Sequence, residues 1–586
     1  MTDFTWNENM EEAAMKILSV NMTEATITVE DLPQEYRGLG GRGLTSTLIN
    51  NEVPPSCDPL GPDNKLIFAP GLLTGTTLVN TSRLSIGAKS PLTQGIKESN
   101  AGGTVAASLG KLGIAAIVVE GQAREGEYYL LTIDAKGDAV LEPASDYKGL
   151  RTYALVEKLL QVYDEKSGVL CIGPAGEFRM ASASIQSSDA DGRPCRAAGR
   201  GGLGAVMGAK GLKAIVVSPV GKHPETLADA DAFKEAAKAF AAAVQADPFA
   251  SQILPSMGTA ALTSMVNAMG AFPSRNATQG VMENHENIGG EKMVALINER
   301  GGKVGHRGCS QCIIRCSNEF VDQEGRYITG SLEYETIWAM GGMTDIADLD
   351  TIARLDFMAD DIGLDTMNTG VAMGVAMDAG YKNFGDGLAA IEMMEEIAQG
   401  TEIGKILGNG PAAVGKHFNH HRVPVVKGQS IAAYDPRGMQ GNGVTYATSP
   451  MGADHTAGNL IGSYLTGQLN PLETEGQVEA SRNAQIFMAY LDCTGLCLFA
   501  AGAMASPEGA QALVKMINIK CGTQLGTDEA VGMGVQALKA EREFNAKAGL
   551  SREDDRLARF FCEEPLPPHN KVFLISDQAL DSVHDF

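Results

Sequence analysis

The spacing of apolar residues along the chain changes near residue 220. Before that point, short runs of β-branched residues stand between glycine and proline turns, a pattern typical of the strands of a sheet domain. The runs that predict strands are residues 25–29, 65–69, 115–120, 128–133, 169–172 and 214–217, with a helical stretch at 150–164 among them. From about residue 222 the pattern favours helices. These are predicted at residues 228–246, 257–269, 291–300, 349–361, 366–379 and 385–400, and again between about 470 and 548.

Two further changes divide the helical part. A linker near residues 420–424 opens a loop-rich stretch, and the tail from Ser551 is charged and contains proline. We expect that tail to form a surface arm. The chain is therefore predicted to be α+β, with a β-rich domain at residues 1–220 and two mostly α-helical domains at 221–425 and 426–586.

The composition is that of a soluble globular protein. Of 586 residues, 44% are hydrophobic and 20% charged, enough for several cores. The 47 basic and 71 acidic side chains leave a formal charge of −24, which disfavours nucleic acid or an anionic membrane as a partner. Residues 1–16 lack the apolar core of a signal peptide. The apolar run 487–505 is interrupted by Asp492 and Thr494, which favours a buried helix pair over a membrane span.

Three of the ten cysteines form the most specific motif. The scatter of the whole set does not resemble a secreted disulfide framework, so we expect a cytoplasmic protein with reduced thiols. Cys309, Cys312 and Cys316 have C-x2-C-x3-C spacing, which lets three thiolates converge. A [4Fe-4S] cluster normally takes four, and Cys497 is the best candidate for the fourth. Zinc and inert core thiols are the alternatives, although zinc usually has paired C-x2-C knuckles or nearby histidines, and only His306 is close.

Four loops rich in glycine or polar residues stand out, at residues 38–43, 81–103, 196–204 and 450–455. Arginines beside bare backbone N–H groups suit phosphate oxygens. Each loop alone is explained equally well by tight strand turns. None matches a Walker sequence or a convincing dinucleotide fingerprint.

A short repeat links the two helical parts. Residues 357–365 and 487–497 both contain D-x-x-G-L-(C/D). One copy is explained by helix capping, with Gly at one helix end and Asp at the next start. Two copies, the second carrying Cys497, indicate two related sites that face a shared object. An aspartate carboxylate can accept a hydrogen bond from the N–H edge of a heterocycle, so two copies of one cofactor would fit.

In combination, the C-x2-C-x3-C loop, the paired D-x-x-G-L motifs, the Arg83 and Asn100 loops and residues 199–208 resemble the tungsten-containing aldehyde:ferredoxin oxidoreductase family over most of the chain. The resemblance implies an N-terminal β-sheet domain that carries a bis-pterin cofactor with tungsten or molybdenum, beside a [4Fe-4S] cluster. The implied iron ligands are Cys309, Cys312, Cys316 and Cys497. The implied pterin residues are Asp360, Gly363, Leu364 and Asp365 for one pterin and Asp492, Gly495 and Leu496 for the other. Further contacts to pterin, phosphate or a bridging Mg2+ are implied for Arg83, Asn100, Ala101, Gly102, Arg196, Ala197 and Arg200.

The resemblance also implies a glutamate and a histidine beside the metal. The matching stretches contain Glu335 as the expected base, Glu333 as its rival, and His455 and Tyr334 as hydrogen-bond donors. Without the resemblance, a surface carboxylate and a core histidine would explain them. The implied reaction oxidises an aldehyde to a carboxylic acid, and a ferredoxin or small iron–sulfur subunit accepts the electrons.

Two alternative functions stay open from the sequence. One is a reductase of the benzoyl-CoA reductase type, disfavoured because residues 317–492 contain no cysteine. The other is a non-catalytic iron–sulfur electron carrier. The chain also lacks the E-x-x-H motif that places a metal at the dimer interface of some family members, so both a homo-oligomer and a hetero-oligomer are open.

Overall fold

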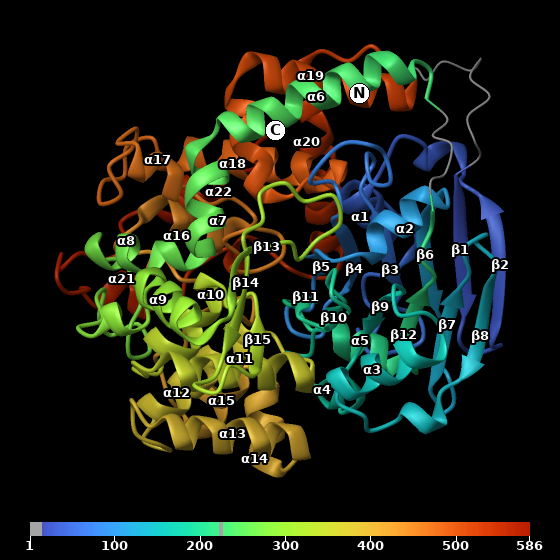
Figure 1. The fold of residues 1–586 in the computed structure, drawn as a ribbon. Helices are drawn as coiled ribbons and strands as arrows, with labels where there is room; N and C mark the ends of the chain where they lie inside the picture. Colours follow the sequence, from blue (N-terminus) through green and yellow to red (C-terminus); the bar gives the residue numbers. More distant parts are fainter. Residues whose placement is uncertain (1–14, 222–226) are drawn as a thin grey trace.

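The computed structural model describes residues 15–221 and 227–586 (Figure 1). The N-terminal part contains two six-stranded mixed sheets, in the strand orders β2-β1-β6-β3-β4-β5 and β11-β10-β9-β12-β7-β8. The first sheet consists of β1 (Lys16–Asn21), β2 (Thr26–Asp31), β3 (Leu66–Pro70), β4 (Leu84–Lys89), β5 (Ile96–Ala101) and β6 (Ile114–Glu120). The second consists of β7 (Tyr129–Ile133), β8 (Ala139–Pro143), β9 (Gly168–Cys171), β10 (Ile185–Ser187), β11 (Arg196–Ala198) and β12 (Leu212–Val217).

The two sheets repeat one connection plan. Each begins with an antiparallel hairpin whose first strand, β1 or β7, pairs in parallel with the last strand, β6 or β12. That last strand pairs antiparallel with β3 or β9. A helix precedes the third strand and another precedes the last. These helices are α1 (Gly41–Glu52) and α2 (Val105–Lys111) in the first half, and α3 (Thr152–Val162) and α5 (Leu203–Ala209) in the second. The β3–β4 and β9–β10 connections, the latter containing α4 (Pro174–Glu177), therefore occupy equivalent positions.

Apolar side chains from both sheets form one core. Leu18 and Phe68 of the first sheet belong to the same buried cluster as Leu131 and Ile215 of the second. All six predicted strands are present, whereas β1, β4, β5, β8, β10 and β11 were missed. Strand β5 shows why: its sequence, Ile-Lys-Glu-Ser-Asn-Ala, is largely polar, yet five of its six residues are buried. Because most of its residues are polar, the sequence pattern did not reveal this strand, although its side chains are buried.

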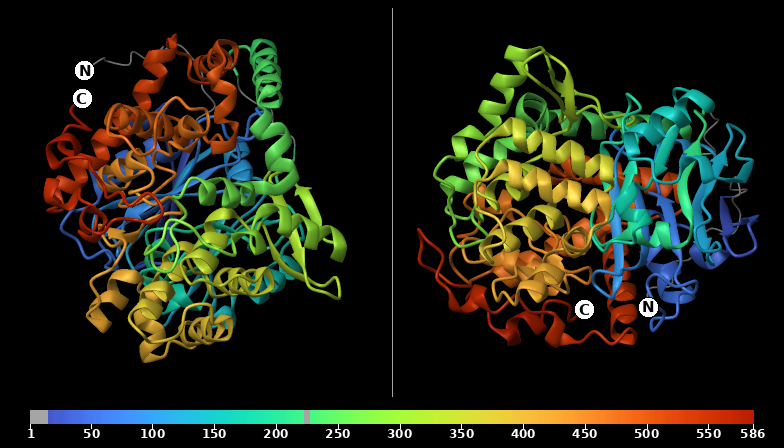
Figure 2. Two further views of the ribbon diagram at one scale, coloured as in Figure 1. Left: turned by 90° about the vertical axis from the view of Figure 1, so that its left-hand side faces the viewer. Right: turned by 90° about the horizontal axis from the view of Figure 1, so that it is seen from below.

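The rest of the chain is mainly helical, which confirms the α+β fold class. Figure 2 shows the blue and cyan strands gathered on one side and the green, yellow and orange helices on the other. The first helices are α6 (Ala230–Ala246), α7 (Leu254–Met257), α8 (Leu262–Ala268), α9 (Gly290–Arg300), α10 (Tyr334–Ile337), α11 (Leu349–Ile362), α12 (Thr366–Asp378), α13 (Gly387–Gln399), α14 (Glu402–Gly408) and α15 (Pro411–Phe418). The later helices are α16 (Gln440–Thr448), α17 (Ile461–Leu465), α18 (Gln477–Thr494), α19 (Pro507–Cys521), α20 (Thr527–Lys547), α21 (Phe560–Glu563) and α22 (Asp577–Asp581).

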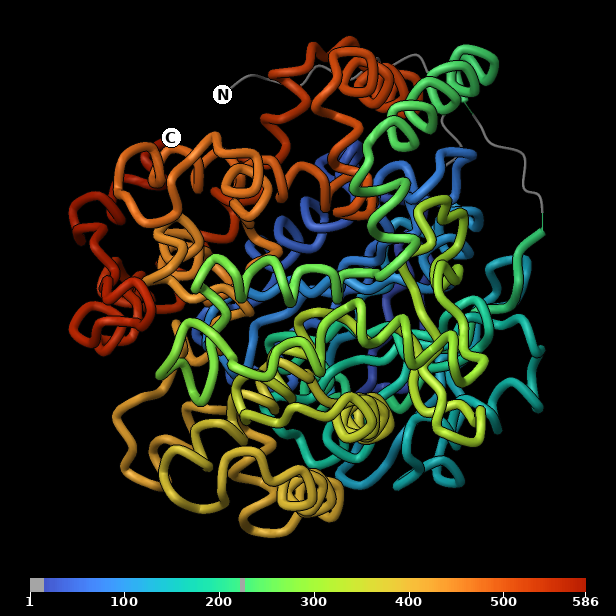
Figure 3. The backbone as a smooth tube through the Cα atoms, turned by 60° about the vertical axis from the view of Figure 1, so that its left-hand side comes forward, coloured from blue at the N-terminus to red at the C-terminus, as the bar shows by residue number. Residues whose placement is uncertain are grey.

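A small antiparallel sheet that the sequence did not predict lies within the helical part. It consists of β13 (Lys303–His306), β14 (Ser317–Val321) and β15 (Tyr327–Gly330). A two-residue pair, β16 (Val425–Val426) and β17 (Gln429–Ser430), follows the predicted linker. Figure 3 shows the gold helices α13 and α14 at the opposite end of the helical part from the red helices α19 and α20. The predicted boundary at residue 426 between the two helical domains stays a prediction.

The C-terminal tail is not a surface arm, so that expectation is wrong. Phe560, Phe561 and Val583 are buried and belong to the same core as the helices before residue 465. Apart from Asp555, the charged residues of the tail are exposed or partly exposed, while Phe560, Phe561 and Phe573 are buried, and the sequence-based prediction took account only of the charged residues. In the part of the chain that the structure describes, no single helix is long and apolar enough to span a membrane. Helix α18 and the 3-10 helix Leu498–Ala505 meet that criterion only as a pair bent by 113°.

Candidate active site

The cysteine loop, residues 307–316, joins β13 to β14 and lies against the second D-x-x-G-L turn, residues 492–497. One residue of the β3–β4 connection bridges them. The Asn80 N–H donates to the Gln311 carbonyl at 3.1 Å, and the Asn80 carbonyl accepts from the Cys497 N–H at 2.8 Å. The structure therefore brings the predicted fourth cysteine to the C-x2-C-x3-C loop.

Two of the four sulfur atoms, those of Cys312 and Cys497, accept hydrogen bonds from side-chain donors. The Arg83 guanidinium donates to Cys497 Sγ at 3.2 Å, and Asn80 Nδ2 donates to Cys312 Sγ at 3.5 Å. Only glycine fits at position 102, because a Cβ there would lie 2.7 Å from Cys309 Sγ. The nearby sulfur of Cys497, more than any other group, raises the pKa of Arg83. N–H donors and a fixed cation stabilise thiolates and lower the cost of a negatively charged iron–sulfur cluster.

The spacing of the sulfur atoms argues against zinc. Tetrahedral thiolate ligands at about 2.3 Å from one ion lie roughly 4 Å apart. Among the described residues, only Asp189, Asp191 and His306 form a group of three such ligand atoms within 4.8 Å of one another, so no three of the cysteine sulfurs do. A four-iron cluster holds its thiolates farther apart, because each binds a different iron atom.

The two D-x-x-G-L motifs form matching turns. Helix α11 ends at Gly363 and α18 at Gly495, with φ of 80° and 83°, a left-handed conformation that glycine adopts at low cost. The Gly363 carbonyl accepts from the Ser184 N–H at 2.9 Å, and the Gly495 carbonyl accepts from the Arg83 N–H at 3.2 Å. The first D-x-x-G-L turn, residues 360–365, thus binds the β9–β10 connection, and the second binds the equivalent β3–β4 connection.

The first aspartate of each turn is largely shielded from water: Asp360 is 6% exposed, and the Asp492 side chain is 15% exposed. Burial, reinforced by Asp356, raises the pKa of Asp360 well above its ordinary value. Burial and Glu98 raise the pKa of Asp492 to about 8. A buried carboxyl held neutral in this way can donate a hydrogen bond as well as accept one, which suits the mixed donor and acceptor edge of a heterocycle.

Arg42, which the sequence reading did not select, fixes the second turn. Its guanidinium pairs with Glu541 at 2.8 Å and with Asp492 at 3.3 Å, and it is only 2% exposed. The residue stands in the glycine-rich loop 38–43 that the sequence analysis singled out for arginine beside bare backbone. The long sequence separation between Arg42 and Glu541 left no local signal for the pair.

The predicted phosphate-contacting residues come from the two edge strands β5 and β11 and the segments beside them. Asn100, Ala101 and Gly102 lie at the end of β5, and Arg196, Ala197 and Arg200 lie on or just after β11. Two buried donors in this region have no hydrogen-bond partner, Asn100 Nδ2 and Arg196 Nε, while Arg200 Nε and Asp365 Oδ2 lack a hydrogen bond but lie 3.6 Å apart as an ion pair. Buried polar atoms in native proteins nearly always have partners. The two unpaired N–H donors therefore fit the oxygen atoms of an anionic heterocyclic cofactor.

Arg200 connects this region to the predicted catalytic residues. Its guanidinium lies 3.6 Å from Asp365 Oδ2 and donates to the carbonyls of Ala453 at 2.8 Å and Ser430 at 2.6 Å. Ala453 directly precedes Asp454 and His455. The arginine thus holds the segment that carries the histidine against the first D-x-x-G-L turn.

Glu335 and His455 face each other. Glu335 Oε1 lies 3.4 Å from His455 Nε2, and Glu335 Oε2 accepts from the Ala433 N–H at 3.0 Å. Burial raises the pKa of Glu335, and His455 opposes that rise. Neither Glu335 Oε1 nor His455 Nδ1 has a hydrogen-bond partner. A carboxyl whose pKa is raised toward neutrality, beside an imidazole, is the arrangement that general acid–base catalysis uses.

The structure places the other two predicted catalytic residues differently. The Tyr334 hydroxyl donates to the Ala433 carbonyl at 2.8 Å, so its proton is already engaged. Glu333 accepts from Ser331 at 2.9 Å and from the Thr259 hydroxyl, and it lies 3.7 Å from Arg196. Glu333 therefore belongs to the surroundings of the cysteine loop, while Glu335 alone faces His455.

A buried ion pair behind His455 was not predicted. Lys97 Nζ lies 2.9 Å from Asp454 Oδ2, and both side chains are less than a tenth exposed. Burial alone would raise the pKa of Asp454, but the Lys97 and Arg200 cations hold it well below its usual range. Asp454 Oδ1 lies 3.9 Å from His455 Nδ1. The histidine therefore stands between a permanently charged carboxylate and Glu335.

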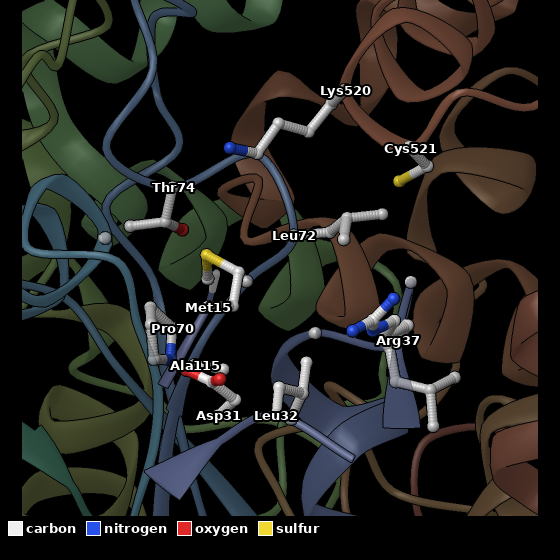
Figure 4. Close-up of a pocket in the computed structure, with 15 residues that line it drawn as sticks. Met15, Asp31, Leu32, Arg37, Pro70, Leu72, Thr74, Ala115, Lys520 and Cys521 are labelled. Atoms are coloured by element: carbon white, nitrogen blue, oxygen red, sulfur yellow. The ribbon is translucent and has the colours of Figure 1, made fainter. Parts of the chain in front are cut away.

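A separate cavity of about 170 Å³ lies on the outer side of the β3–β4 connection (Figure 4). Leu72, which contributes to its wall, also donates its N–H to the Cys493 carbonyl at 3.0 Å. Arg37, Asp31 and Lys520 give the cavity a mixed charge. None of the predicted catalytic or cluster residues lines it, so it is distinct from the site around Glu335.

Comparison with protein families agrees with this geometry. The N-terminal domain model of aldehyde ferredoxin oxidoreductase matches residues 17–219, and the model of domains 2 and 3 matches residues 235–584. Tungsten-containing aldehyde ferredoxin oxidoreductases of Pyrococcus horikoshii and Thermococcus kodakarensis are each 34% identical to this chain, covering 94% of it and 92% of the relative. A WOR-like subunit of an aliphatic sulfonate oxidoreductase from Pyrococcus furiosus is 26% identical over 94% of the chain and 90% of its own length.

A solved structure shares the fold. The active-site complex BamBC of benzoyl coenzyme A reductase, solved with 1,5-dienoyl-CoA, superposes with a TM-score of 0.78 at 20% identity, covering 97% of this chain and 93% of that chain. The fold and the site define an oxidoreductase assembled on two repeated sheets and a helical cover. The chain belongs to the aldehyde ferredoxin oxidoreductase family, whose tungsten-containing members imply a tungsten–pterin cofactor.

Proposed function

We propose that this protein oxidises aldehydes to carboxylic acids with a tungsten or molybdenum bis-pterin cofactor, and that electrons leave through a [4Fe-4S] cluster. The observation that carries the proposal is one convergence. Three arginines link these parts: Arg83 donates to Cys497, Arg196 contacts Ser317 beside Cys316, and Arg200 lies between Asp365 of the first turn and the segment that carries His455. A non-catalytic electron carrier would need neither the paired turns nor a buried glutamate facing a histidine.

The residues that would hold each group follow from that arrangement. Cys309, Cys312, Cys316 and Cys497 would bind the cluster. Each D-x-x-G-L turn would bind one pterin through its aspartate and backbone, and Asn100 and Arg196 would supply unpaired donors for pterin or phosphate oxygens. When bound, the metal–pterin group accepts the two electrons of the oxidation, and the cluster passes them on one at a time.

Within this chain, Glu335 accepts a proton and His455 donates a hydrogen bond during the reaction. Oxidation of an aldehyde consumes one water and releases a carboxylic acid, two protons and two electrons. The ionised Glu335 accepts a proton from the water that adds to the aldehyde carbon. His455, whose Nε2 lies 3.4 Å from Glu335 and whose Nδ1 has no hydrogen-bond partner, donates a hydrogen bond from Nδ1 to the aldehyde oxygen. Glu335 is preferred over Glu333, whose oxygens already have hydroxyl partners.

The test is metal analysis and turnover of anaerobically purified protein. We expect tungsten or molybdenum, pterin, about four iron atoms per chain, and reduction of benzyl viologen by aliphatic or aromatic aldehydes. Iron and sulfide without tungsten, molybdenum or pterin would contradict the proposal in favour of an electron carrier. No turnover with any aldehyde, together with reduction of an aromatic thioester, would contradict it in favour of a reductase.

A further inference from the structure

The cavity beside the β3–β4 connection lies where the sheet domain meets the C-terminal helices. Its walls include the end of β2, the glycine-rich loop 38–40, the β3–β4 connection and the last residues of α19. Ligand pockets occur preferentially at such junctions between domains. The volume of about 170 Å³ is enough for about six water molecules, so the cavity has room for a small organic molecule.

Two cations reach this cavity from distant parts of the chain. Arg37 directly follows the 3-10 helix Gln34–Tyr36, and Lys520 lies in the last turn of α19. In Figure 4 the Lys520 side chain extends toward the cavity from above and Arg37 from the right. Asp31 is the one acidic residue on the wall among the described residues. Positive charges therefore outnumber negative ones, which favours a ligand with a single negative charge.

Hydrogen-bond donors without partners lie on the same wall. The backbone N–H groups of Gly38, Gly40 and Gly71 donate to no residue in the described part of the chain. Thr74 is only 5% exposed, and its hydroxyl has no partner either. Buried polar groups nearly always have partners, and N–H groups without a side chain beside them can approach oxygen anions closely. These donors fit the two oxygen atoms of a carboxylate.

The rest of the wall is apolar, with side chains from five separate segments: Met15, Leu32, Leu39, Pro70, Leu72 and Ala115. Contact with such a surface is favourable for a hydrocarbon body, because it removes apolar area from water. An inorganic anion gains nothing from that contact and loses hydration. The cavity therefore fits a small carboxylate with a hydrocarbon chain better than it fits phosphate.

The cavity shares a wall with the second D-x-x-G-L turn. The N–H groups of Leu72 and Leu73 donate to the carbonyls of Cys493 and Thr494, each at 3.0 Å. The backbones touch as well, because a Cβ at Gly71 would lie 2.1 Å from the Cα of Gly495. A molecule that packs against Leu72 therefore acts on the turn that continues into Cys497.

We propose that this cavity binds a small monocarboxylate, with its carboxylate at Arg37 and Lys520, and that the bound molecule acts on the second D-x-x-G-L turn through Leu72. The inference rests on the proposed function in one respect, since a small carboxylate is what aldehyde oxidation releases. The product thus binds away from Glu335 and slows turnover without competing with the aldehyde.

The experiment measures binding and its location together. Butyrate, its neutral analogue butyramide and inorganic phosphate are titrated into the anaerobically purified enzyme in a calorimeter. Cys521, which is partly exposed and lines the cavity, reports the location through its alkylation by iodoacetamide, measured by mass spectrometry. We expect butyrate to bind at least about 10-fold more tightly than the other two and to protect Cys521, but not the exposed Cys562. Phosphate binding as tight as that of butyrate, or no protection of Cys521, would overturn the proposal.

Arg37→Gln is the variant that tests the site, and Arg552→Gln is its matched control. Both arginines are exposed, so neither change threatens the fold, and both remove one positive charge. Arg552 does not line the cavity. We expect Arg37→Gln to weaken butyrate binding about 10-fold and to abolish the protection of Cys521, and Lys520→Gln to act in the same direction. Equal affinity and equal protection in Arg37→Gln and Arg552→Gln would contradict the assignment.

Failure of the proposed function would be recognised separately, because calorimetry and alkylation need no turnover. If the wild-type protein oxidised no aldehyde, butyrate binding that depends on Arg37 would still support the site. Where aldehyde is oxidised, butyrate should lower kcat without raising KM in the wild type, and this effect should disappear in Arg37→Gln. Inhibition that is purely competitive, or that persists unchanged in Arg37→Gln, would contradict the action on the second turn.

Discussion

The two D-x-x-G-L turns each end a helix at a glycine in the left-handed region, with φ of 80° and 83°, but they have different neighbours. Each binds an equivalent connection of the repeated sheet domain through backbone hydrogen bonds. The second turn continues into Cys497, whose sulfur accepts from Arg83 of the first half. The first turn continues into Asp365, which faces Arg200 of the second half, and Arg200 holds the segment carrying His455. On the proposed function, the repeated scaffold would serve electron transfer at the second turn and proton transfer at the first.

The charges around the two turns differ in burial as well. Arg42 and Glu541, which support the second turn, are 2% and 0% exposed. Arg151, which lies 3.7 Å from Asp361 of the first turn, is 36% exposed. The second turn therefore depends on a desolvated ion pair between Arg42 and Glu541. The corresponding Arg151–Asp361 contact at the first turn is screened by water.

The largest expected effect is on the rate of aldehyde oxidation when Glu335 is changed. Glu335→Gln keeps the shape of the side chain and its contact with Ala433 but removes the base, so we expect kcat for aldehyde oxidation to fall about 10³-fold. Iron content and the electron paramagnetic resonance signal of the cluster should not change. Loss of the signal would mean that a change at Glu335 also disturbs the cysteine loop, so the two turns would not act independently.

The pH dependence of the wild-type enzyme checks the same residue. Because burial raises the pKa of Glu335, its ionised, active form is lost at a higher pH than for an ordinary glutamate. We expect kcat/KM to decline as pH falls through that raised value, and Glu335→Gln to lack this acidic limb. An acidic limb that persists in the variant would assign the base to another group, with Glu333→Gln as the next variant to measure.

Cys497→Ser is the matching change on the electron side. It removes one of the four iron ligands and the acceptor of the Arg83 hydrogen bond. We expect ferredoxin-linked turnover to fall more than about 100-fold, since changes to groups that merely support a metal ligand already cost 10- to 100-fold. Tungsten content, measured by mass spectrometry, should stay near that of the wild type. Cys562→Ser, at an exposed cysteine far along the chain, is the control.

Stability should report the difference in burial between the two turns. Arg42→Ala leaves the fully buried Glu541 without its cation, so we expect the free energy of unfolding to fall by about 3–5 kcal/mol. Arg151→Ala breaks the exposed counterpart and should cost about 0–1 kcal/mol. Denaturant midpoints of the two variants measure the contrast. Equal losses would show that burial does not distinguish the turns.

Much of the site could be predicted because its signals are local. The cysteine spacing, the paired D-x-x-G-L motifs and the strand runs each occupy a few consecutive residues. Arg42–Glu541 and Lys97–Asp454 could not be predicted, because each pair joins residues more than 350 positions apart. The sheet repeat was hidden for a related reason: strands such as β5 are buried yet polar, so they lack the apolar pattern from which strands are recognised.

The turn glycines offer the smallest test of the comparison. Gly363 and Gly495 have nearly the same φ, so Ala at either position should cost about 1–2 kcal/mol of backbone strain. Their surroundings differ, however. A Cβ at Gly363 would lie 2.8 Å from the backbone nitrogen of Gly173, whereas one at Gly495 would meet both the backbone Cα of Gly71, at 2.9 Å, and the Thr74 hydroxyl. We therefore expect Gly495→Ala to be the more destabilising of the two in denaturant unfolding, and Thr74→Ala to recover only part of its loss, because the backbone contact with Gly71 stays. If Gly363→Ala were the costlier change and Thr74→Ala gave no recovery, the first turn would be the more rigid one.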